Sequence, residues 1–237
     1  LVLIMDITLA TGVTIDYDET DLKEHKKLSN YAFYSPSVEY YLKNEKDNLN
    51  KVIIVGAGVG IYSKYLDSEN VETINIEPVL SRFNKLEANL ENATNHNKAC
   101  ADTSGTGTMY YFDDAKSGAK LDINFGDNSE SVDVITVDSL NITDADLLVI
   151  DANGKEYEVL QGSAASITPS NKVIVKWNTD ICESKDELAL YLQNSTKTCS
   201  ILHWESSDNS VVKKRLGTAQ YPWDLLSIVI DADILME

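Results

Sequence analysis

The chain has 237 residues, a length that suits one large α/β domain with a sizeable buried core. Its 38 acidic and 20 basic residues give a net charge of −18, which repels polyanions unless a local basic patch overrides that field. The densest basic cluster, Lys213–Arg215, is only three residues long, and we interpret it as a solvated strand end or turn. We therefore expect that nucleic acid is not a substrate.

Three cysteines and three histidines stand far apart in the sequence and form neither a disulfide pattern nor a metal-ligand motif. They are Cys100, Cys182, Cys199, His25, His96 and His203. We expect reduced thiols, a cytoplasmic location and no bound metal. The apolar opening of the chain is too short for a signal peptide or a membrane span. Because the first residue is not methionine, we expect one domain of a longer polypeptide.

The first fifty residues predict a helical lead-in to the main domain. A charged stretch over residues 20–30, with Thr20 as a candidate N-cap, predicts a short helix. Residues 36–47 predict a second helix, with Pro36 in its first turn and an apolar stripe along one side. Aromatic residues cluster here at Tyr31, Phe33, Tyr34, Tyr40 and Tyr41. Packing against the sheet is the commoner role of such a cluster, and a roof over a ligand site is the alternative.

From residue 51 onward, apolar runs alternate with helical patterns. Residues 52–55 form an unbroken apolar run, typical of a parallel strand covered on both faces, and a helix over 60–67 follows. A strand over 71–76, a helix over 79–92 and a third strand over 98–101 continue the alternation. Strands separated by helices predict right-handed crossovers and a mostly parallel sheet.

Residues 104–130 break this alternation and predict an antiparallel excursion or hairpin. Beyond it the pattern predicts five further strands and two helices. The strands are 132–137, 146–150, 172–177, 200–204 and 225–230, and the helices are 155–167 and 183–193. The strand-rich tail predicts an antiparallel hairpin that closes one edge of the sheet.

The first strand of the main domain ends in alternating glycines, Gly56, Gly58 and Gly60. Glycine tolerates positive φ and lets a ligand approach the bare backbone, so this turn predicts a nucleotide site. Glu77 ends the next strand at the same sheet edge, where it can reach a ribose above the glycines. A dinucleotide fingerprint needs a glycine at position 61, where Ile61 stands, which disfavours a nicotinamide-dependent oxidoreductase. S-adenosylmethionine, which has no phosphate, suits the turn better.

Five motifs between about residues 51 and 177 resemble, in order, those of FkbM-type S-adenosylmethionine-dependent methyltransferases, which often methylate sugar hydroxyls. They are the glycine turn 55–63; Ile76–Pro78 with Phe83, Leu86 and Asn89; Asp102–Gly105 with the aromatic run 109–112; Thr136–Leu140; and Leu147–Asp151 with Gly154, Glu156, Val159, Leu160 and Gly162. The resemblance implies a Rossmann-like class I methyltransferase fold with a mostly parallel seven-stranded sheet. It also implies a methyltransferase domain over 51–237, a saccharide or glycan acceptor, and fusion to glycosyltransferase domains.

The resemblance further implies a set of cofactor-binding residues. They are Gly56, Ala57, Gly58, Gly60, Tyr62, Ser63, Glu77, Pro78, Asp102 and Asp151. The glycines would leave room for the methionine part and the ribose, and Glu77 would accept both ribose hydroxyls. Asp102 would accept from the adenine amino group, with a turn cap before Gly105 as the alternative. Asp151 lies at a strand end where ligands bind, with an N-cap of the next helix as the alternative.

Methyl transfer to a hydroxyl needs a general base that takes the proton. Asp151 is our candidate base, and Asn153 is the candidate for orienting the acceptor. Lys176 would serve as base if burial lowers its pKa, and otherwise it would pair with an acid such as Asp151. Nothing in the sequence supports a magnesium ion on Asp151.

Four positions depart from the family pattern, which commonly has acids at 54, 153 and 176 and lysine at 149. Here they are Ile54, Asn153, Lys176 and Val149. Two hypotheses stay open: a compensated change within one active site, or a degenerate site in a non-catalytic binding or assembly module. Within the enzyme hypothesis, small-molecule and protein acceptors also remain open beside saccharides.

Overall fold

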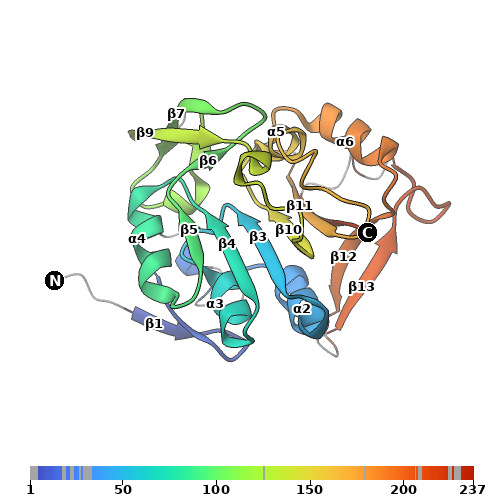
Figure 1. Cartoon of the computed structure of the whole chain (residues 1–237), viewed down its shortest axis with the longest axis horizontal. Helices are drawn as coiled ribbons and strands as arrows, with labels where there is room; N and C mark the ends of the chain where they lie inside the picture. The colour runs from blue at the N-terminus through green and yellow to red at the C-terminus, as the bar shows by residue number, and fades with distance from the viewer. Residues whose placement is uncertain are drawn as a thin grey trace.

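A mixed eight-stranded sheet forms the centre of the protein in a computed structural model (Figure 1). The model describes residues 5–17, 20–21, 24–26, 28, 34–124, 126–178, 180–205, 207, 210–223, 226 and 231–237. Within those ranges the strand order is β13-β12-β14-β11-β10-β3-β4-β5. The parallel strands are β3 (Lys51–Val55), β4 (Glu72–Ile76), β5 (Thr94–His96), β10 (Leu147–Ile150) and β11 (Lys172–Asn178). These strands confirm the predicted α/β fold.

Helices cover both faces of this sheet. Because alternate residues of a strand point to opposite faces, the residues of each strand divide between two cores. Val52 and Ile54 of β3 pack in one core cluster with α2 (Pro36–Glu45), α3 (Ile61–Ser68) and α4 (Leu80–Asn89). Ile53 and Val55 pack in the other cluster with α5 (Glu156–Gln161) and α6 (Lys185–Asn194). The unbroken apolar run of β3 is therefore required by two buried faces.

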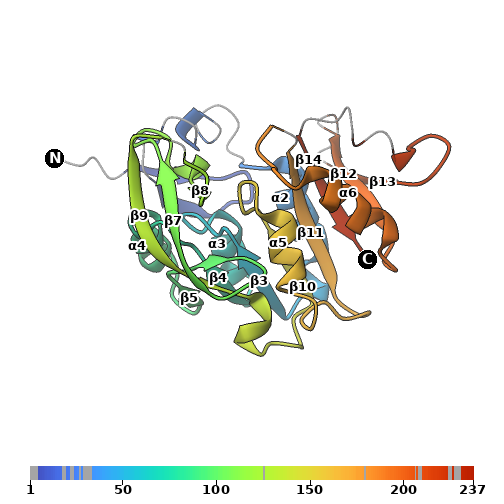
Figure 2. The same cartoon turned by 90° about the horizontal axis from the view of Figure 1, so that it is seen from above.

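The predicted excursion after residue 104 is a second sheet, with strand order β6-β9-β7-β8 in the described chain. Its strands are β6 (Ala99–Cys100), β7 (Gly105–Tyr111), β8 (Lys120–Leu121) and β9 (Asn128–Ile135). Figure 2 shows β7 and β9 at the β5 end of the main sheet, with β12 and β13 at the other end.

One predicted strand of the main sheet was wrong. We expected residues 98–101 to be its third parallel strand, but β5 takes that place beside β4, and β6 pairs with β9 of the second sheet. The sequence of β5 is Thr-Asn-His, which lacks an apolar run because this edge strand is partly exposed. The predicted seven strands thus become eight in the described residues.

The antiparallel C-terminal edge was predicted, but its order was not. β12 (Cys199–Glu205) and β13 (Ser210–Arg215) form the outer hairpin, and β14 (Asp231–Met236) lies between β11 and β12, antiparallel to both. The strand predicted over 225–230 falls, except for Leu226, outside the described residues. β14 escaped prediction because acids at two of its first three positions hide the apolar residues that follow.

The lead-in contains a β hairpin that we did not predict, β1 (Met5–Thr8) with β2 (Thr14–Tyr17). Asn89 of α4 holds it: its side-chain oxygen accepts from the Asp16 amide at 3.0 Å, and its amide donates to the Asp16 carbonyl at 2.8 Å. The predicted helix over 20–30 lies partly outside the described residues, as do Tyr31 and Phe33. The helix predicted from Pro36 is present as α2, and the domain boundary at residue 50 stays a prediction.

No helix within the described ranges is long and apolar enough to span a bilayer.

Candidate functional site

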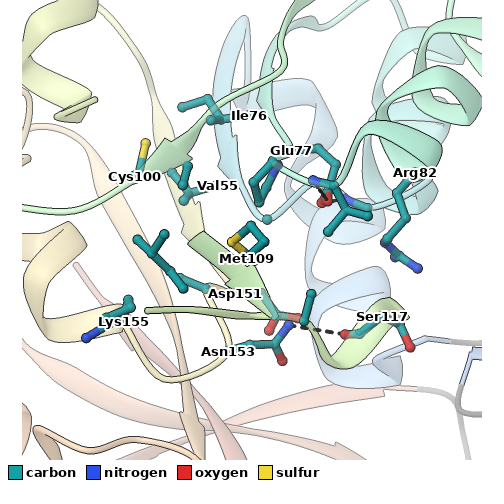
Figure 3. A pocket seen from close by; sticks show the side chains of 18 of the residues that line it. Val55, Ile76, Glu77, Arg82, Cys100, Met109, Ser117, Asp151, Asn153 and Lys155 are labelled. Carbon is teal, nitrogen blue, oxygen red and sulfur yellow. Dashed lines mark hydrogen bonds between the residues drawn. The ribbon is translucent and has the colours of Figure 1, made fainter. Parts of the chain in front are cut away.

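A pocket lies at the carboxyl ends of β3, β4 and β10, the sheet edge at which α/β proteins bind ligands (Figure 3). Five of the predicted cofactor-binding residues line this pocket together, although they come from three separate loops: Gly56, Gly58, Glu77, Pro78 and Asp151. Asn153 lines it as well. The structure thus brings the predicted cofactor side and the predicted acceptor side of the site together.

The glycine turn is necessary because the backbone is left-handed and crowded. Gly56, Gly58 and Gly60 have φ of 78°, 61° and 92°, where residues with a Cβ are strained. A Cβ on Gly56 would lie 1.9 Å from the Asp151 carbonyl oxygen, so this glycine lets the ends of β3 and β10 meet. A Cβ on Gly60 would lie 2.9 Å from a methyl of Leu86, so this glycine lets α3 pack on α4. Gly60 does not line the pocket itself.

Glu77 joins the end of β4 to the glycine turn. Its Oε2 accepts a hydrogen bond from the Gly58 amide at 2.9 Å, and its Oε1 accepts from the Val79 amide at 3.0 Å. The residue is 5 % exposed, and burial raises the pKa of Glu77, while Arg82 and the two amide donors lower it. Because each carboxylate oxygen has more than one acceptor position, both can still accept from a ribose diol.

Arg82 of α4 is a pocket residue that sequence reasoning missed. Its guanidinium would lie 2.4 Å from a Cβ on Gly58, so it covers the glycine turn directly. It donates to Glu24 at 2.9 Å and to Asp21 at 3.3 Å, and all three residues are buried. Burial lowers the pKa of Arg82, but Glu24 and Glu77 outweigh it and hold that pKa above its ordinary range. Its partners lie 58 and 61 residues away, so no local pattern could reveal the cluster.

The turn after β10 presents Asp151 and Asn153 to the pocket, and buried Glu156 holds this turn. The Glu156 carboxylate accepts from the amides of Ala152 and Gly154, each at 3.0 Å. Burial raises the pKa of Glu156 to about 7. α5 begins at Glu156 with Lys155 at its N-cap, so Asp151 is not the N-cap that we gave as its alternative role. Glu156 belonged to the motif, but nothing in the sequence pointed to this contact.

Lys176 lies on β11 and does not line the pocket. Its Nζ is 3.0 Å from Asp231 and 3.4 Å from Asp233, both on β14, so the ion pair that we gave as its alternative role is present. Burial lowers the pKa of Lys176, but Asp233, Asp151 and Asp231 outweigh it and hold that pKa above its ordinary range. The condition that we set for a base, a lowered pKa, is therefore not met.

The remaining predicted cofactor residues lie in three different places. Ala57 and Tyr62 line a smaller adjoining pocket that shares Tyr34, Gly58 and Arg82 with the first. Ser63 is fully buried and donates to the Asn75 side chain at 2.6 Å, which is a role in the core. Asp102 is exposed and lines neither of these two pockets.

One part of the pocket lining is apolar, and Asp102, our candidate for the adenine, is not in it. Residues from β4, the loop after it and the second sheet build this apolar wall: Ile76, Pro78, Val79, Ala99, Cys100, Met109 and Leu121. A flat apolar ring placed against this wall would be held by contact area, since burial of apolar surface is the main attraction at such sites. Sequence reasoning missed Met109 and Leu121 because the antiparallel pairing of β7 with β8 brings them together.

The described part of the chain contains no group of three His, Cys, Asp or Glu side chains that could hold a metal ion.

A mostly parallel sheet with an antiparallel edge, a glycine turn after β3, an acid after β4 and apolar residues beside that acid is the arrangement of class I S-adenosylmethionine-dependent methyltransferases. The residues fit that cofactor: Gly58 leaves bare backbone beside Glu77, and the apolar wall suits adenine. The profile of the methyltransferase FkbM domain matches residues 55–197, more than half of the chain. The protein therefore belongs to the FkbM methyltransferase family, which confirms the resemblance and the predicted cofactor.

Solved structures of similar fold include two methyltransferases. The FkbM methyltransferase from Methylobacillus flagellatus has 13% identity and a TM-score of 0.51, with 80% of this chain and 44% of that one covered. The TehB-like SAM-dependent methyltransferase from Corynebacterium glutamicum has 10% identity and a TM-score of 0.52, with 92% and 96% covered. The chain thus spans less than half of the Methylobacillus protein. A search of curated protein sequences finds no match.

Proposed function

We propose that this protein is an S-adenosylmethionine-dependent O-methyltransferase that methylates a hydroxyl of a sugar or glycan. The observation that carries the proposal is that Glu77, the glycine turn and Asp151 line one pocket. The first two suit the cofactor, and Asp151 supplies a carboxylate beside them for the acceptor. The saccharide acceptor rests on the family resemblance, since FkbM-type enzymes often methylate sugar hydroxyls.

On the cofactor side, Glu77 would accept hydrogen bonds from the ribose hydroxyls, and the apolar wall that includes Pro78, Met109 and Leu121 would hold the adenine. Gly56, Gly58, Ala57 and Tyr62, which line this pocket or the adjoining one, would hold the methionine part. S-adenosylmethionine supplies an electrophilic methyl group on a sulfonium centre.

On the acceptor side, Asp151 takes the hydroxyl proton and Asn153 orients the sugar. In-line transfer needs the acceptor oxygen aligned with the methyl carbon and sulfur, and alignment supplies about 7–11 kcal/mol in favourable cases. Lys176 of β11 pairs with Asp231 and Asp233 of the neighbouring β14 and balances their charge. Its raised pKa suits a cation that orders the site rather than a base.

The second candidate function is a binding or assembly module that retains the fold without catalysis. It is favoured by the ion pairs of Lys176, because the cation that stands at a family acid position is engaged in a structural contact. Three further expectations are part of the methyltransferase proposal: fusion to glycosyltransferase domains, a cytoplasmic location and the exclusion of nucleic acid. The net charge of −18 supports the exclusion of nucleic acid.

The proposal is tested by calorimetric titration with S-adenosylhomocysteine, run beside NADH. We expect micromolar binding of S-adenosylhomocysteine by the wild type and at least tenfold weaker binding by Glu77→Ala, about what a hydrogen bond to a charged group contributes. Glu72→Ala is the matched control, since Glu72 is the exposed residue at the opposite end of the same strand. Binding of NADH alone would overturn the assignment of the site.

Turnover is then tested with a panel of sugars, by release of S-adenosylhomocysteine. We expect Asp151→Asn to bind S-adenosylhomocysteine like the wild type and to lose methyl transfer by about 100-fold or more, the usual contribution of a general base. Wild-type turnover in Asp151→Asn would exclude Asp151 as the base. Cofactor binding without methyl transfer to any sugar, protein or small-molecule acceptor would favour the binding module.

A further inference from the structure

A chain of hydrogen bonds runs along one wall of the pocket, from α4 to the turn after β10. Arg82 donates to Asp21 Oδ2 at 3.3 Å, and the Ser117 hydroxyl donates to Asp21 Oδ1 at 2.8 Å. The Asn153 side-chain amide then donates to the Ser117 carbonyl at 3.1 Å. Figure 3 shows this last bond as a dashed line, with Arg82, Ser117 and Asn153 on the side of the pocket away from Cys100.

Asp21 is the centre of this chain. It is 1% exposed, and besides Arg82 and the Ser117 hydroxyl it accepts from the amides of Glu24 and Ser117. A buried donor or acceptor that loses its partner costs free energy of folding. A buried carboxylate that accepts from four donors therefore keeps the segments that carry those donors together. Asp21 therefore joins the lead-in to α4 and to the 3-10 helix η2 (Lys116–Gly118) of the second sheet.

Each end of the chain bears on a proposed part of the site. At one end, the Arg82 guanidinium lies against Gly58, which leaves no space there for even a methyl group. At the other end, Asn153 itself has a φ of 49°. This is a left-handed conformation that needs support from its surroundings. The Ser117 carbonyl accepts from the Asn153 side chain and so adds to the support that Glu156 gives the backbone on both sides of Asn153. The lead-in is thus coupled to both the cofactor side and the acceptor side.

We propose that Asp21 and Ser117 are positioning residues of the methyltransferase site: they hold Asn153 toward the acceptor and close this wall over the cofactor. Because this contact restrains the wall that Arg82, Ser117 and Asn153 line, weakening it is expected to speed cofactor exchange. This inference rests on the proposed function, because it takes the pocket as the cofactor site. It assigns a role in the site to a lead-in that lies outside the matched family region, residues 55–197.

The first test is the rate of S-adenosylhomocysteine exchange, measured by stopped-flow fluorescence. Asp21→Asn keeps one oxygen of the two and so loses two of the four hydrogen bonds to this side chain, and we expect it to bind and release the probe at least about tenfold faster. Ser117→Ala, which loses only the hydroxyl, should show a smaller acceleration in the same direction. Asp16→Asn is the matched control, because Asp16 also ties the lead-in to α4, through Lys85 at 2.9 Å, but Lys85, unlike the Arg82 and Ser117 that Asp21 bonds, does not line the pocket.

A second readout needs no cofactor: amide hydrogen exchange of residues 150–156 in the ligand-free protein. We expect faster exchange there in Asp21→Asn and Ser117→Ala, and no change in Asp16→Asn. If folded variants with unchanged thermal midpoints show wild-type rates in both experiments, the proposal is overturned. If Asp21→Asn does not fold, Ser117→Ala decides by the same two readouts.

The two experiments separate this inference from the function that it builds on. If the wild type does not bind S-adenosylhomocysteine, the proposed function fails, and amide exchange alone decides whether Asp21 and Ser117 position the turn. If the wild type binds the probe but neither variant changes its exchange, the function stands and the positioning role is wrong.

Discussion

Replacing Glu156 by glutamine should remove a pH dependence from the stability of the protein. Glu156 is 1% exposed, and burial raises the pKa of its carboxyl from 4.5 to about 7. A raised pKa means that folding favours the neutral form of the carboxyl. Its contribution to stability is therefore fully present below about pH 4.5 and is lost as the pH rises through about 7.

The size of the effect follows from the two pKa values. A difference of one pKa unit corresponds to about 1.4 kcal/mol, so the wild type should lose about 3 kcal/mol of unfolding free energy relative to the variant between pH 4.5 and 7. Glutamine has the same size and keeps one oxygen that can accept from the amide of Ala152 or Gly154. The variant therefore tests the charge of Glu156 more than its shape.

The assay is urea unfolding of the wild type and of Glu156→Gln, followed by circular dichroism at several pH values from 4.5 to 8. Glu158→Gln is the control, because Glu158 is on the same helix but is only half-buried. The difference in unfolding free energy between wild type and Glu156→Gln should change with pH, and by more than the same difference for the control. A constant difference for Glu156→Gln would refute the reasoning that burial dominates at this carboxyl.

Two further changes test the contacts that build the site. Gly56→Ala should destabilise the protein by about 2 kcal/mol or more, because the new Cβ would collide with the Asp151 carbonyl and the φ of residue 56 is positive. Gly105→Ala is the control: a Cβ at residue 105 meets open space, so this variant should stay within about 1 kcal/mol of wild type. Equal urea midpoints for these two variants would contradict that steric argument. Lys176→Met should cost about 2–4 kcal/mol, measured by thermal unfolding, because Asp233 would remain buried without its cation. A thermal midpoint at the wild-type value would show that this ion pair is dispensable.

The sequence by itself determined the frame of the site. β3 can be predicted because a strand buried on both faces is a continuous apolar run. The glycine turn after it can be predicted because crowded, left-handed backbone favours glycine. Glu77 and Asp151 follow from the same logic, since both end apolar strands that lie side by side with β3 in a parallel sheet. All of these signals are local, and each spans only a few residues.

Only the tertiary structure decided which charged and polar groups meet. Arg82 pairs with acids of the lead-in that are distant in the sequence, and Lys176 pairs with Asp231 and Asp233 on the neighbouring β14. The Asn153 side chain donates to the Ser117 carbonyl in the second sheet. A side chain leaves no trace of a distant partner in its own neighbourhood, because long-range hydrogen bonds and ion pairs impose no periodicity on the chain. Local patterns therefore locate the edge where the ligand binds, and the packing of distant segments sets the walls and the charges around it.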